Sequence, residues 1–198
     1  MSVDLETHKI HKQIAKKHKS ICMAVRFRSK KPWEVWSGGL DSRLFQWDFS
    51  RGMPSDVFDM NERDPSPTQM FNPPFVYALE ISADGKWIAA GLGDSTIQVL
   101  SQESSKKRSK KDEPINLRLE NGHNAMVNCL SFLPSTEGYP LRLLSGSANG
   151  SVALWNLSTE GNCELAQTYK LDASVGRLNW LKTFALDESN IHVAAAGV

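Results

Sequence analysis

Short runs in which apolar and polar residues alternate recur along this chain. Three share one form, each closed by a bulky residue: 22–27, 76–81 and 127–132. Runs of this length and period, bounded by turn residues, predict β-strands. A fourth and weaker copy spans 175–180 and continues to 191–197. We therefore expect equivalent first strands near 22–28, 75–81, 126–132 and 175–181.

A second pattern follows each of the first three runs. A small residue is followed four positions later by Asp or Asn and ten positions later by Trp or Leu, in the stretches 37–47, 90–100 and 145–155. Self-similarity of this kind predicts a repeat architecture. In the third copy Asn149-Gly150 is a strong hairpin signal, which predicts strands at 126–132, 141–146, 151–156 and 163–169. The fold class is all-β.

The repeats resemble the WD-repeat (WD40) family. The resemblance rests on the pairs Lys17-His18 and Gly122-His123, on Trp47-Asp48 and Trp155-Asn156, and on the turn between them. It implies a partial β-propeller, an open ring of about three and a half blades of four antiparallel strands. The implied divisions are 1–17 (outer strands of a preceding incomplete blade), 18–60 (a repeat), 61–71 (an acidic, Pro-rich loop), 72–119 (a degenerate repeat with a basic insert at 101–113), 120–170 (a repeat) and 171–198 (an incomplete repeat).

Two features leave alternatives open. Residues 1–17, read alone, also fit a basic amphipathic helix, whereas alignment with the family makes them strands. An open half-ring exposes strand edges and blade faces, so we expect the chain to be either a natural truncation or an incomplete gene model. Expressed alone, we expect it to aggregate, dimerise or unfold with poor cooperativity.

The first repeat contains a Ser, a His and an Asp, which suggests a catalytic triad. The resemblance implies a different role, a buried structural relay in which turn acid, imidazole, hydroxyl and indole bond in series. Its members are His18, Ser37, Asp41 and Trp47 in the first repeat, and His123, Ser145, Asn149 and Trp155 in the third. The second repeat keeps Asp94 alone. No nucleophile elbow exposes a serine, so we expect no enzyme.

Charge and cysteine usage add little chemistry. The 198 residues carry a net charge of +1, which does not indicate a general nucleic-acid binder. A basic run consists of Lys106, Lys107, Arg108, Lys110 and Lys111, and it fits either a nuclear import signal or a solvated loop. Cys22, Cys129 and Cys163 form no C-x-x-C pair and are expected to be buried thiols. We expect no cofactor, metal, small-molecule substrate or membrane association.

What remains is a platform for binding other proteins, and we expect it in the cytoplasm, the nucleus or both. In some members of the family a Trp-Asp-x-Arg signature docks a ubiquitin-ligase adaptor. Here Arg51 falls one position late after Trp47-Asp48, so a role as a substrate receptor of a cullin-RING ligase is implied by resemblance without a matching motif. The alternative is a nuclear factor associated with nucleic acid or chromatin. The sequence names neither the partner nor the propeller face that binds it.

Overall fold

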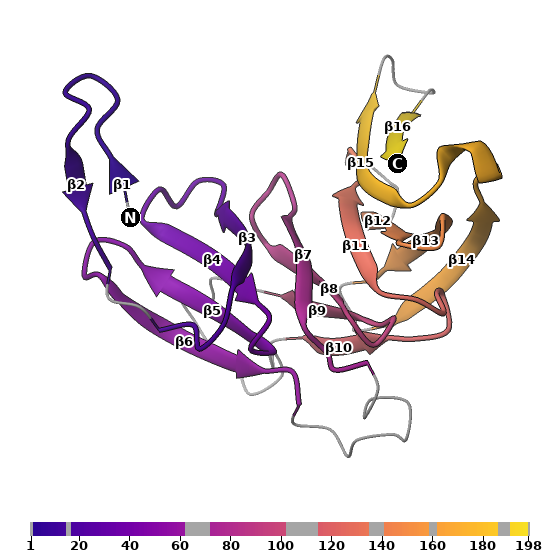
Figure 1. Ribbon diagram of the computed structural model, residues 1–198, viewed down its shortest axis with the longest axis horizontal. Coiled ribbons are helices and arrows are strands. Elements are labelled where there is room, and N and C mark those ends of the chain that lie inside the picture. Colours follow the sequence, from indigo (N-terminus) through magenta and orange to yellow (C-terminus); the bar gives the residue numbers. More distant parts are fainter. Residues whose placement is uncertain are drawn as a thin grey trace.

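The computed structural model describes residues 2–14, 17–61, 72–101, 115–134, 141–158, 162–185 and 191–197. Its strands form three four-stranded antiparallel sheets and two two-stranded ones, arranged along an open arc (Figure 1). The basic run and most of the acidic loop lie outside the described residues. No described helix is long and apolar enough to cross a membrane.

Each four-stranded sheet is one blade whose strands follow each other in chain order. Blade one consists of β3 (Cys22–Phe27), β4 (Glu34–Gly39), β5 (Arg43–Asp48) and β6 (Met53–Asp59). Blade two consists of β7 (Val76–Ile81), β8 (Trp87–Leu92), β9 (Ile97–Ser101) and β10 (Asn116–Leu119). Blade three consists of β11 (Val127–Phe132), β12 (Leu141–Ser147), β13 (Ser151–Leu157) and β14 (Cys163–Lys170).

A two-stranded sheet lies at each end of the arc. The N-terminal one pairs β1 (Ser2–Val3) with β2 (Ile10–Lys12), so this segment is a strand pair rather than an amphipathic helix. The C-terminal one, blade four, pairs β15 (Leu178–Ala185) with β16 (Ile191–Gly197) and follows a 3-10 turn, η1 (Ala173–Val175). The all-β, partial propeller prediction is confirmed.

The first strands of blades one to three lie where the alternating pattern predicts them, but the fourth does not. It begins at Leu178, three residues later than expected, because Asp172 caps η1 and Gly176 turns the chain with φ 64°. An irregularity in the pairing recurs after Cys22, Val76, Val127 and Leu178. This shared register makes these four residues equivalent, and it likewise makes Trp180 the equivalent of Ala24, Ala78 and Cys129 in the other blades.

Adjacent blades pack through a glycine on each second strand. A Cβ at Gly38 would overlap the Val76 side chain, and one at Gly146 would come within 2.5 Å of Leu178 Cδ2. Val76, Val127 and Leu178 are completely buried at these joints. The small residue in each repeated phrase is thus followed by the glycine that lets the next blade approach. Cys22, at the equivalent place in blade one, is exposed, because no described blade covers it.

Candidate functional site: the turn relays and the inner-strand groove

In blade one the structure brings His18, Ser37, Asp41 and Trp47 together. Trp47 Nε1 donates to Ser37 Oγ at 2.8 Å, and His18 Nε2 lies 2.8 Å from the same oxygen. His18 Nδ1 lies 3.0 Å from Asp41 Oδ1. A proton on Nδ1 satisfies every group in the series, because Ser37 then accepts from the indole and donates to Nε2. Ser37 is only 4% exposed, so its hydroxyl is not presented to a substrate.

The carboxylate of Asp41 is held in its ionised form. Burial by itself raises the pKa of Asp41, but hydrogen bonds from His18 and from the Lys19 backbone N–H outweigh it, and the pKa lies below its usual value. The imidazole of His18 also meets the Phe45 ring edge-on, with 4.6 Å between centroids. The relay therefore joins the turn, the loop before β3 and the blade core.

In blade three the relay has a different end. Trp155 Nε1 donates to Ser145 Oγ at 2.8 Å, and His123 Nε2 lies 2.7 Å from that oxygen, as in blade one. The other nitrogen, Nδ1, lies 2.8 Å from Ser151 Oγ and not against Asn149, so the expected fourth member is wrong. Asn149 instead accepts from the Ser151 backbone N–H at 3.0 Å and bonds to Asn124. Burial without a carboxylate partner lowers the pKa of His123 to about 4.

Blade two places an ion pair where the other blades have a histidine. Asp94 Oδ2 accepts from Arg118 Nη2 at 2.7 Å, with the Asp94 and Arg118 side chains 4% and 2% exposed. Arg118 comes from β10, the outer strand, and not from the position before the first strand. Sequence comparison between repeats could not find it for that reason. The signal available was a lone Arg in the otherwise apolar run 117–119.

The other described residues that the sequence singled out are Arg51 and the three cysteines. Arg51 lies in the turn after β5 with its side chain 76% exposed, and its Nε is 3.2 Å from Asp48 Oδ2. Lys106, Lys107, Arg108, Lys110 and Lys111 lie outside the described residues. The cysteine prediction is wrong for Cys22, which is exposed, while Cys129 is buried and Cys163 half-buried. Burial raises the pKa of the Cys129 thiol to about 11.

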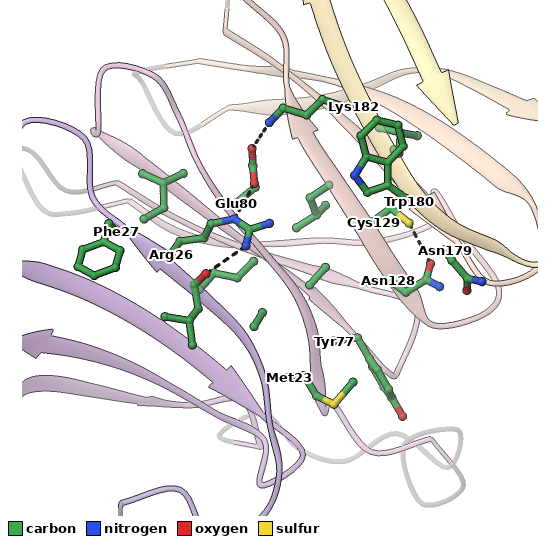
Figure 2. Close-up of a pocket in the computed structure, with 17 residues that line it drawn as sticks. Met23, Arg26, Phe27, Tyr77, Glu80, Asn128, Cys129, Asn179, Trp180 and Lys182 are labelled. Atoms are coloured by element: carbon green, nitrogen blue, oxygen red, sulfur yellow. Dashed lines mark hydrogen bonds and ion pairs between the residues drawn. The ribbon is translucent and has the colours of Figure 1, made fainter. Parts of the chain in front are cut away.

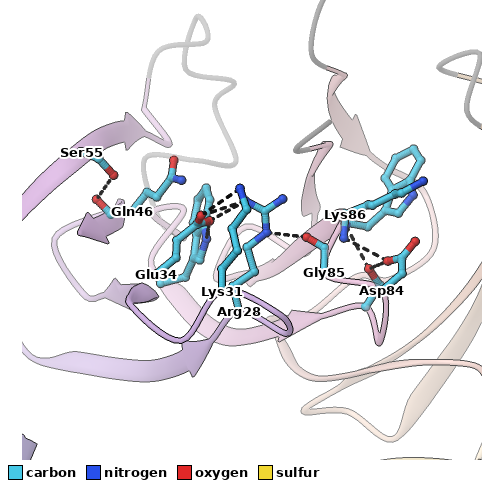
Figure 3. A network of polar contacts seen from close by, with 11 residues as sticks. Arg28, Lys31, Glu34, Gln46, Ser55, Asp84, Gly85 and Lys86 are labelled. Atoms are coloured by element: carbon cyan, nitrogen blue, oxygen red, sulfur yellow. Dashed lines mark hydrogen bonds and ion pairs between the residues drawn. The ribbon is translucent and has the colours of Figure 1, made fainter. Parts of the chain in front are cut away.

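A buried arginine that the motifs did not suggest joins blades one and two (Figure 3). Arg28, 5% exposed, donates from Nε to the Gly85 carbonyl at 2.5 Å and from Nη1 to Glu34 at 2.8 Å. Glu34 also accepts from Trp36 Nε1 at 3.0 Å. Gly85 sits at φ 75° in the hairpin between β7 and β8. This network therefore holds blade two against blade one and has a structural role.

The four inner strands β3, β7, β11 and β15 line a groove of about 750 Å³ (Figure 2). Glu80, from β7, lies between two cations contributed by other blades. Its Oε2 accepts from Arg26 Nε at 3.0 Å, and its Oε1 accepts from Lys182 Nζ at 2.8 Å. Both cationic side chains are 50% exposed, whereas that of Glu80 is 12% exposed. The groove is therefore polar at its centre and accessible.

Trp180 gives the groove its largest apolar group. The equivalent residues in the other blades are small, namely Ala24, Ala78 and Cys129. Trp180 is 51% exposed, although it lies between Leu178 and Leu181, which are 0% and 3% exposed. Packing of the repeat therefore does not require an indole here. This site was missed because the sequence alignment placed Trp180 three positions too late, at the closing residue of the strand.

Comparisons with known proteins agree with this architecture. The family model described as WD domain, G-beta repeat matches residues 66–100 and 116–156. The WD repeat-containing protein 53 homolog of Dictyostelium discoideum is 23% identical over 84% of this chain and 47% of its own. This chain thus spans about half the length of that relative.

Two solved structures share the fold over most of the chain. The structure of U3-55K has a TM-score of 0.64 at 19% identity, covering 86% of this chain and 45% of that one. The crystal structure of RRP9 WD40 repeats has a TM-score of 0.61 at 20% identity, covering 86% and 44%. The family model thus identifies WD40 repeats in two parts of the chain, and the two structures show that its fold is that of a WD40 propeller.

Proposed function

We propose that this chain is a non-enzymatic protein-interaction scaffold that holds a partner against the inner-strand groove. The observation that carries the proposal is the half-exposed Trp180, at a repeat position that is small in the other three blades. An accessible indole beside charged groups is the usual anchor of a protein interface, because it buries a large apolar area and keeps a polar edge. The relays supply a rigid frame and no exposed nucleophile.

The test compares Trp180→Ala with a matched control. Tyr169, on the outer strand β14, is 48% exposed, against 51% for Trp180. Proteins captured by the unchanged chain and by Tyr169→Ala, but lost with Trp180→Ala, define the partners of the groove in quantitative mass spectrometry. If the same proteins are lost with both variants, or if both variants keep them, a scaffold that uses this groove is contradicted.

A narrower form of the proposal is a receptor-like component of a cullin-RING ubiquitin ligase. It rests on Arg51, which follows Trp47-Asp48 and is exposed. An adaptor that binds there would replace Asp48 as the partner of the Arg51 guanidinium. Binding of a purified ligase adaptor that is lost in Arg51→Ala but kept in Arg43→Ala supports it. Arg43 is the control because its guanidinium also pairs with an aspartate, Asp59, at 3.6 Å.

The alternative, a factor that binds nucleic acid through the basic run, predicts a different dependence on salt. Contacts to phosphates weaken steeply as salt rises, because counterions are released on binding. An interface centred on an indole weakens much less. Replacing the five basic residues by glutamine and titrating salt separates the two functions.

A further inference from the structure

We infer that the groove binds an acidic peptide segment of a partner protein, with a carboxylate between Arg26 and Lys182 and a neighbouring apolar side chain against Trp180. The inference rests on the proposed scaffold function and adds the chemistry of what the scaffold holds. It depends on the charges of one repeat position and on the strand geometry that places Trp180 next to them.

The charges come from a single position of the inner strands. The shared register makes Arg26, Glu80, Ser131 and Lys182 equivalent, one from each blade. Ser131 is fully buried and bonds to Thr183 Oγ1 at 2.8 Å, so three charged groups face the groove. Two cations and one carboxylate leave a formal charge of +1, and an incoming carboxylate balances it.

Both oxygens of Glu80 are already engaged by Arg26 and Lys182, whereas the cations retain donors for a ligand. A guanidinium carries five N–H donors and an ammonium three. Both side chains are half in solvent, so a ligand carboxylate reaches them with a small loss of hydration. A basic peptide meets two cations and an occupied carboxylate, and like-charge contacts of this kind select against it.

The binding position for the apolar side chain of the ligand lies on β15. Trp180 and Lys182 are two residues apart on this strand and therefore point to the same face, and Figure 2 shows the indole beside the Lys182–Glu80–Arg26 series. An extended peptide that lies along the groove can place an acidic side chain on Lys182 and an apolar side chain on Trp180. The ligand is therefore a peptide of mixed acidic and apolar residues.

The experiment measures fluorescence anisotropy of three labelled peptides on the full chain. One alternates glutamate and leucine, the second has glutamine in place of glutamate, and the third has lysine. The acidic peptide should bind most tightly and lose affinity as salt is raised. Lys182→Gln and Arg26→Gln should each weaken it about two- to fivefold, the size expected for a partly exposed ion pair.

Glu80→Gln is the decisive variant because it should strengthen the acidic peptide about two- to fivefold. A gain of affinity cannot come from misfolding, and thermal unfolding of each variant provides the folding control. Trp180→Ala should weaken the acidic and the neutral peptide alike, by at least about fivefold, as for a hot-spot residue.

The outcomes separate this inference from the function on which it rests. Equal binding of the acidic and neutral peptides, or no response to Glu80→Gln, overturns the acidic ligand. If Trp180→Ala still removes captured partners in that case, the scaffold stands and its ligand is of another chemistry. If no peptide binds and Trp180→Ala keeps every partner, the proposed function fails as well.

Discussion

Blades one and three contain the same series of contacts and differ in the group that holds the far imidazole nitrogen. In both, one serine hydroxyl lies between an indole N–H and a histidine Nε2, at 2.7 to 2.8 Å. In blade one the imidazole Nδ1 hydrogen-bonds to the carboxylate of Asp41, and in blade three it hydrogen-bonds to the hydroxyl of Ser151. Both relays contain a serine because one hydroxyl must accept from the indole N–H and donate to the imidazole at the same time. The turn group can change because Nδ1 needs only one acceptor.

The change of that group alters the electrostatics of the blade. Asp41 is stabilised as an anion, since the bonds it accepts overcome the effect of burial on its pKa. His123 has no carboxylate to stabilise a positive charge, and burial keeps it neutral. One blade is therefore held by a charge-assisted bond and the other by neutral bonds, which are weaker on average.

The largest effect is expected from removing the shared hydroxyl. Ser37→Ala and Ser145→Ala each leave a buried indole N–H and an imidazole nitrogen without a partner, so each should lower the free energy of unfolding by about 2–4 kcal/mol. Chemical denaturation measures it, with the exposed Ser55→Ala as control. Clearly unequal losses would show that the two hydroxyls do not play the same part.

The next effect separates the two ends of the relays. Asp41→Ala removes a charge-assisted bond and the acceptor of the Lys19 N–H, and should cost about 1–3 kcal/mol. Ser151→Ala removes a neutral bond and should cost about 1 kcal/mol. A greater loss in Ser151→Ala than in Asp41→Ala would reverse the order that the comparison predicts.

Acid should loosen blade three before blade one. The pKa of His123 is about 4 in the folded chain against 6.5 ordinarily, so its contribution is complete above pH 6.5 and is lost as pH falls toward 4, by up to about 3 kcal/mol. The pKa of Asp41 is lowered from 3.8, so its contribution persists until pH falls below that value. Hydrogen exchange of the backbone amides, corrected for intrinsic rates, measures the stability of blade three in β11–β14 and of blade one in β3–β6. In His123→Gln the blade-three response between these pH values should disappear.

The smallest effect concerns the residue that the relay does not use. Asn149 contacts Asn124 and the Ser151 N–H at the surface rather than His123, so Asn149→Ala should cost less than about 0.5 kcal/mol. Denaturation alongside Ser151→Ala measures the difference. If the two variants were equally destabilised, Asn149 would have to act through Ser151 by orienting its backbone.

Much of the architecture could be predicted from local pattern. The first strands of blades one to three and all strands of blade three lie within about a residue of their expected places. They were predictable because alternation and turn residues are local properties of the chain. The relay of blade one was expected from the resemblance to the WD-repeat family. The fourth strand was misplaced because η1 and Gly176 delay it without any break in the apolar pattern.

The sequence by itself determined the repeat and the class of fold, because each depends on residues at fixed spacing within one blade, and the resemblance to the WD-repeat family supplied the relay serines. The tertiary structure decided which groups meet between strands or blades that are distant in sequence. Arg118 reaches Asp94 from an outer strand, Arg28 reaches Gly85 in the next blade, and Glu80 collects Arg26 and Lys182 from two other blades. Such contacts depend on how strands and blades lie beside each other, and no period along the chain records that arrangement.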